Sequence, residues 1–207
     1  MQILFITGVT GEDYVTQKLW LLASLKRCPR HPGGGCGFAG HGTYERASPR
    51  GCRIARWYCP QGHCTFSLLP DCLASHLSGT LEEVEAVVRV VEHAPSQELA
   101  SERLRPELNL PEALRWLRRR VQRVHQFLWL VKGLFPALFA GCELSLSAFG
   151  ERLGVEGPVL VVLREMAKPF LVDLPTPVGF CPRPGRRRAG RGANQQPVGP
   201  DPPGFQA

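Results

Sequence analysis

The chain has 207 residues, which is enough for one compact domain or two small ones. Hydrophobic residues make up 43% and charged residues 21%, which excludes a wholly disordered chain, and the net charge of +7 favours an anionic partner such as nucleic acid. The sequence offers no uncharged apolar run of about 18 residues for a membrane-spanning helix. It also offers no early basic residue of the kind that begins a signal peptide, so we expect a cytoplasmic protein with no membrane partner.

Shifts in composition divide the chain into five predicted segments. They are an N-terminal strand and helix segment (1–25), a Cys-, Gly- and Arg-rich β module (26–77), a helical region (78–141), a short mixed segment (142–181) and a basic tail (182–207). The tail is rich in Pro, Gly and Arg and cannot bury a core, so it is predicted to be disordered. The predicted fold class is α+β and mostly helical.

Short apolar runs predict the elements outside the main helical region. They indicate strands at 2–7, 42–46 and 53–58 and helices at 14–25 and 147–153, while 158–163 fits either a strand or a helix.

Residues typical of helix ends divide the helical region. Thr80 is a predicted N-cap for a first helix, which Pro95 ends. Ser96 caps a second helix, which Pro106 limits. Pro111 occupies the first turn of a third helix. The apolar stripe of this third helix consists of Leu114, Leu117, Val121, Val124 and Leu128.

Six of the eight cysteines lie between residues 28 and 72, and in a reducing cytosol such a cluster suggests a metal site before a disulfide. Zn²⁺ takes four Cys or His ligands at tetrahedral positions, which two glycine-rich knuckles can supply. The predicted ligands are Cys28, Cys36, Cys59 and Cys64, with His31 and His63 as alternatives because the spacings exceed the usual two residues.

The alternative to a metal site is a ribbon that has lost its metal and keeps these cysteines as small buried residues. Cys52 and Cys72 are predicted to be packing residues. Cys142 and Cys181 stand alone in the sequence and are predicted to be structural or inert.

The β module carries a pattern that points to a known family. Gly-Thr-Tyr-Glu-Arg at 42–46 precedes Tyr58-Cys59, which Thr65-Phe66-Ser67 follows. This pattern resembles the N-terminal zinc ribbons of bacterial insertion-sequence transposases and their accessory proteins, over residues 26–125. The resemblance implies a zinc ribbon and then a helix-turn-helix, with 96–104 as its first helix and 110–124 as its recognition helix.

The basic face of that third helix is the predicted DNA contact. Arg115, Arg118, Arg119 and Arg123 project away from the apolar stripe, where guanidinium groups can meet phosphates and guanine. The predicted DNA-binding residues also include Arg120 and, in the tail, Arg186, Arg187 and Arg188. Alternatively, this basic helix pairs with the acidic helix at 82–92, because residues 80–112 carry eight acids against three arginines.

We therefore predict a mobile-element-type DNA-binding protein that is not an enzyme. As an accessory protein, it would have DNA and a transposase as partners. Otherwise it would be a non-catalytic relic of a transposase, with DNA as its partner. A protein-interaction or regulatory module with structural cysteines is one alternative. The other is a fragment of a catalytic transposase, which would need three carboxylates for two metal ions, although few acids follow Glu112.

Overall fold

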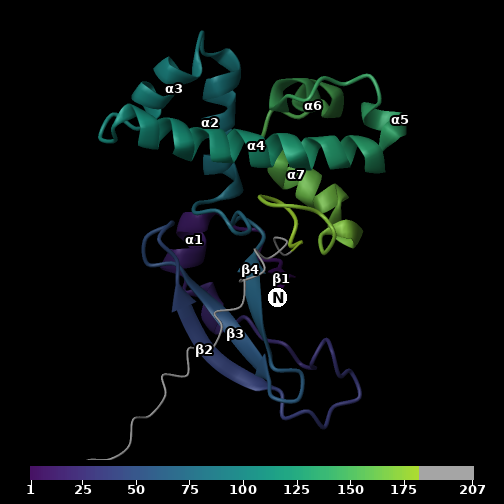
Figure 1. The fold of residues 1–207 in the computed structure, drawn as a ribbon. Helices are drawn as coiled ribbons and strands as arrows, with labels where there is room; N and C mark the ends of the chain where they lie inside the picture. The colour runs from purple at the N-terminus through teal and green to yellow at the C-terminus, as the bar shows by residue number, and fades with distance from the viewer. Residues whose placement is uncertain (182–207) are drawn as a thin grey trace, which may run out of the picture.

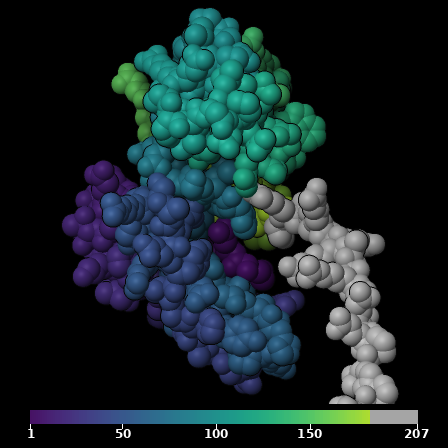
Figure 2. All heavy atoms as spheres, turned by 60° about the vertical axis from the view of Figure 1, so that its left-hand side comes forward, coloured from purple at the N-terminus to yellow at the C-terminus, as the bar shows by residue number. Residues whose placement is uncertain are grey.

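The computed structural model describes residues 1–181. It is an α+β structure in which a four-stranded sheet lies at one end with α1 beside it, and α2 to α7 gather at the other (Figure 1). Figure 2 shows the same division, with the N-terminal residues and strands in one lobe and the long helical region in the other. The predicted DNA-binding residues Arg186, Arg187 and Arg188 lie outside the described residues, as does the whole predicted tail.

The sheet joins the β module to the N-terminus of the chain. Its strands are β1 (Gln2–Phe5), β2 (Ala39–Glu45), β3 (Arg53–Cys59) and β4 (Cys64–Pro70), in the order β1-β4-β3-β2. β3 pairs antiparallel with both neighbours, whereas β1 lies parallel to β4, with Ile3 opposite Leu68. The predicted N-terminal strand therefore belongs to the same sheet as the strands of the β module and not to a separate segment.

Helices make up most of the remaining structure. They are α1 (Gly11–Thr16), α2 (Leu81–His93), α3 (Gln97–Leu104), α4 (Leu110–Leu134), α5 (Pro136–Phe139), α6 (Leu146–Leu153) and α7 (Val159–Met166), with 3₁₀ turns η1 (Leu19–Leu21) and η2 (Lys168–Phe170). Two expectations need correction. The helix predicted at 14–25 is α1 followed by η1, because Lys18 adopts a left-handed conformation that interrupts it. The recognition helix that the resemblance implies at 110–124 is the first part of α4, which continues for ten more residues.

The predicted helix starts are confirmed by their hydrogen bonds. Thr80 and Glu83 form a reciprocal capping box at the start of α2, and the side chain of Ser96 accepts from the backbone N–H of Leu99 in α3. Asn109 caps α4, with Pro111 in the first turn. The ambiguous apolar segment at 158–163 is helical, as α7.

A single apolar core connects the sheet to the helices. It contains Ile54 and Leu69 of the sheet together with Val84 of α2, Leu128 of α4 and Leu163 of α7. Burying such side chains stabilises the fold by about 1.5–3 kcal/mol each. The same core therefore holds the sheet against the helical lobe.

Arg164 of α7 fastens this junction. Its side chain is buried, and its guanidinium donates five hydrogen bonds to the carbonyl oxygens of Asp71, Leu73, Pro177 and Val178. Desolvation by burial lowers the pKa of this guanidinium to about 9. Arg164 thus connects the loop after β4 to the last described residues of the chain.

Candidate functional site

Two turns at the far end of the sheet bring together four potential metal ligands. The first turn carries Cys28 and His31, whose backbone N–H donates to the carbonyl of Cys28 at 3.2 Å. Cys36 follows on the same loop, and Cys59 ends β3. The ligand atoms of these four residues all lie within 4.8 Å of one another, and the three cysteines are buried. This cluster could hold a metal ion.

Hydrogen bonds and burial shift the pKa values of Cys28 and Cys59 in opposite directions. Burial by itself raises the pKa of Cys28, but hydrogen bonds from the side chain of His31 and from the backbone N–H groups of Arg30 and His31 bring it down to about 7. His31 Nδ1 lies 3.6 Å from the Sγ of Cys28 and 3.3 Å from that of Cys59. Burial raises the pKa of Cys59 to about 11, and the neighbouring thiols Cys28 and Cys36 add to the rise. Several thiolates at this spacing repel one another, which a bound cation would relieve.

The predicted ligand Cys64 lies beside this group and not within it. A Cβ atom at Gly62 would lie 3.2 Å from the Sγ of Cys59 and 3.3 Å from the Sγ of Cys64, so the two sulfurs flank one glycine. The amide of Gly62 donates to the Sγ of Cys59 at 3.2 Å. The alternative ligand His63 is exposed, at a positive φ of 43°. The structure thus brings together three of the four predicted cysteines and the alternative ligand His31.

The basic face of α4 is the second candidate site. Arg115, Arg118 and Arg119 are exposed, and Arg123 is half-buried, where it donates to the side chain of Gln126 at 3.1 Å. Leu117 of the predicted stripe is buried on the opposite side, which fixes the direction in which the arginines point.

Arg120 does not share the exposure of these arginines. Only 8% of it is exposed, and its guanidinium stacks 4.1 Å from the ring centroid of Trp116 and donates to the Oγ of Ser78 at 3.0 Å. Arg120 faces the loop that precedes α2, and its side chain is held there by contacts within the protein. Its contribution to DNA binding stays a prediction.

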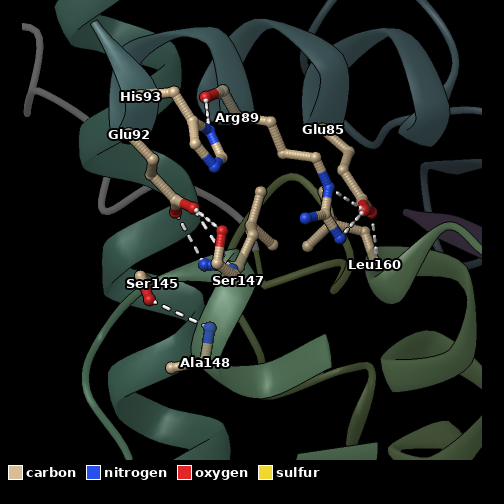
Figure 3. Close-up of polar contacts among 9 residues, drawn as sticks. Glu85, Arg89, Glu92, His93, Ser145, Ser147, Ala148 and Leu160 are labelled. Carbon is tan, nitrogen blue, oxygen red and sulfur yellow. Dashed lines mark hydrogen bonds and ion pairs between the residues drawn. The ribbon is translucent and has the colours of Figure 1, made fainter. Parts of the chain in front are cut away.

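Two acids of α2, Glu85 and Glu92, contact other helices. The carboxylate of Glu92 accepts from the backbone N–H of Leu146 at 2.6 Å and from Ser147 at the start of α6 (Figure 3). Glu85 is buried, pairs with Arg89 at 2.9 Å and accepts from the N–H of Leu160 in α7 at 2.8 Å (Figure 3). Negative charge at a helix N-terminus is stabilising.

No ion pair joins the acidic helix α2 to the basic helix α4 within residues 1–181, although the two helices pack together in the core. There, the ion pair that joins α4 to another helix is a contact of 3.9 Å between Arg118 and Glu98 of α3, both half-exposed or more. Arg118 also donates to the side chain of Gln97 at 3.0 Å. An exposed pair at that distance contributes about 0–1 kcal/mol.

Sequence reasoning missed Ser78 as a partner of Arg120, because Ser78 is 42 residues from it in the chain. The contact with Trp116 was also missed, although Trp116 precedes Arg120 by four residues on the same helix. In the part of the chain that the structure describes, no helix is both long and apolar enough to cross a membrane. The transposase-type resemblance stays a prediction. Comparison of the chain with protein-family models, curated proteins and solved structures found no match.

Proposed function

We propose that this chain is a DNA-binding protein whose ribbon is stabilised by Zn²⁺ and whose DNA contacts come from the exposed arginines of α4. The donor set of three cysteines and one histidine is a common ligand set for structural zinc, which binds in tetrahedral geometry. In this proposal Cys28, His31, Cys36 and Cys59 hold the ion, and the metal contributes to folding of the ribbon without taking part in a reaction.

One observation carries the DNA-binding part of the proposal. Arg115, Arg118 and Arg119 point into solvent from one helix, while Glu85 and Glu92, which could have neutralised them, contact α6 and α7. The positive charge of α4 is therefore largely uncompensated inside the described chain. Guanidinium groups without an internal partner are the usual means of contacting phosphates.

Salt-dependent DNA binding tests this proposal. The affinity of the full chain for duplex DNA should fall steeply with salt, because each contact with a phosphate releases counterions. Replacing Arg118 and Arg119 with Ala should weaken binding and reduce the salt slope by up to about one contact per residue, with little change in melting temperature. Arg103→Ala, an exposed arginine of α3, is the matched control. A double variant that binds DNA normally and melts early would refute the proposal and favour internal pairing.

Metal analysis tests the part of the proposal that concerns zinc. The purified protein should contain one zinc per chain, and Cys59→Ser should lose the metal and unfold the ribbon. Cys142→Ser, which changes a half-buried cysteine far from the cluster, should retain the zinc. A protein that contains no zinc and whose stability a chelator leaves unchanged would rule out the metal site.

The biological role that we propose is to recruit or position a transposase on DNA, or to bind DNA as the remnant of such an enzyme. This role rests on the resemblance of the ribbon sequence and on the binding surface of α4. It requires no catalytic group in this chain.

A further inference from the structure

A hollow lies where the loop before α2 meets the N-terminal half of α4. Its volume is about 400 Å³. It is lined by His76, Leu77 and Ser78 of the loop and by Glu112, Arg115, Trp116, Arg119 and Arg120 of α4. Three of these eight residues are arginines and one is an acid, so the hollow is strongly basic.

Two guanidinium groups stack on the ring of Trp116, and one of them, Arg120, lines the hollow. The guanidinium of Arg120 lies 4.1 Å from the centroid of Trp116, and that of Arg105 lies 4.9 Å from the same centroid. Arg105 has an ion pair with Glu107, whereas Arg120 donates to the Oγ and carbonyl of Ser78, which carry no formal charge. One nearly buried positive charge therefore lies here without a carboxylate bound to it.

The titration of Arg120 agrees with this excess of positive charge. Desolvation is the main cause that lowers its pKa to about 10, and repulsion from Arg105 and Arg119 lowers it further, against a smaller opposing effect from Glu83. An anion placed in the hollow would offset both the desolvation and the repulsion.

The wall of the hollow is formed by Arg115 and Arg119, which are one helical turn apart and exposed. The same two arginines line a second hollow, of about 610 Å³, on their other side, together with Arg118 and Gln122. Arg115 and Arg119 therefore lie between two concave surfaces. Their side chains can reach an anion in the first hollow without breaking a hydrogen bond or ion pair to another residue.

We propose that the hollow between Ser78 and Arg119 binds a phosphate group. Arg115 and Arg119 would donate to its oxygens from the wall, and the stacked Arg120, which also lines the hollow, would supply positive charge. Phosphate in a nucleic-acid backbone and free phosphate share this chemistry. The inference rests on the proposed function in taking the phosphate from DNA, and it then implies that α4 contacts DNA here through the backbone and not through base edges.

Titration of the full chain with inorganic phosphate, followed by tryptophan fluorescence, tests the site. Binding should be saturable, and Trp116→Phe should remove the fluorescence change. The double variant Arg115→Gln, Arg119→Gln should bind phosphate at least about tenfold more weakly, because it loses two charge-assisted donors. Glu112→Gln should bind several-fold more tightly, since it removes the acid from the lining. Arg103→Gln, on the exposed surface of α3, should bind as the original chain does.

A second measurement, competition between phosphate and duplex DNA, separates this inference from the proposed function. Phosphate that binds and displaces DNA supports both. Phosphate that binds a chain with no affinity for DNA supports a site for free phosphate and refutes the proposed function alone. DNA binding in a chain that shows no saturable phosphate binding, or whose phosphate affinity is unchanged in the double variant, overturns the inference and leaves the proposed function standing.

Discussion

Replacing Arg164 with Met tests how the two lobes are held together. The substitution keeps an unbranched apolar side chain in the core but removes all five hydrogen bonds of the guanidinium. The carbonyl of Pro177 would keep a bond of 2.7 Å from the N–H of Ser75. The carbonyls of Asp71, Leu73 and Val178 would lose the donors that Arg164 provides.

The expected loss of stability follows from the three carbonyls that lose a donor. A buried acceptor without a partner costs about 1–3 kcal/mol, and removal of the buried charge recovers part of this total because the charge no longer needs to be desolvated. We expect a decrease of about 3–5 kcal/mol in the free energy of unfolding, a large share of the roughly 5–15 kcal/mol typical of a domain. Arg164→Lys keeps the charge but has fewer hydrogen-bond donors, so its free energy of unfolding should lie between those of Arg164→Met and the original chain.

Urea denaturation monitored by circular dichroism measures this effect, and hydrogen exchange locates it. Amides in the segment that contains Pro177 and Val178 should exchange faster in the variant, because this segment is bound through Arg164. Arg103→Met makes the same chemical change on an exposed helix surface and should alter stability by less than about 0.5 kcal/mol. If Arg164→Met were within about 1 kcal/mol of the original chain, the junction would not depend on this guanidinium.

Two further predictions concern the carboxylate of Glu92 and the thiols of Cys52 and Cys72. Glu92→Gln should lower the free energy of unfolding by about 1–2 kcal/mol, because the carboxylate charge at the start of α6 is lost while one acceptor oxygen remains. Urea denaturation measures this change, and a free energy of unfolding within a few tenths of a kcal/mol of the original would contradict the prediction. Burial raises the pKa of Cys52 to about 11 and that of Cys72 to about 12, so at pH 8 both remain thiols. Mass spectrometry should find both unlabelled by iodoacetamide in the native protein and labelled after denaturation; rapid native labelling would show that they are accessible thiolates.

Local sequence determined where the main helices start and which residues are candidate metal ligands. Thr80, Ser96 and Pro111 mark helix starts correctly because capping depends on residues within one turn of each other. Cys28 and Cys59 were identifiable as candidate ligands because cysteines with nearby glycines in tight turns are typical of zinc knuckles.

Contacts between distant residues decided the rest. β1 pairs with β4 across more than 60 residues, and nothing in either strand specifies that neighbour. Within one run of basic residues, Arg119 faces solvent and Arg120 turns inward, because a helix advances 100° per residue and the loop at Ser78 lies on only one side of α4. That His31 and not Cys64 belongs to the cluster follows from the turns on which they lie, because sequence spacing limits which residues can come together, whereas backbone conformation decides which ones do.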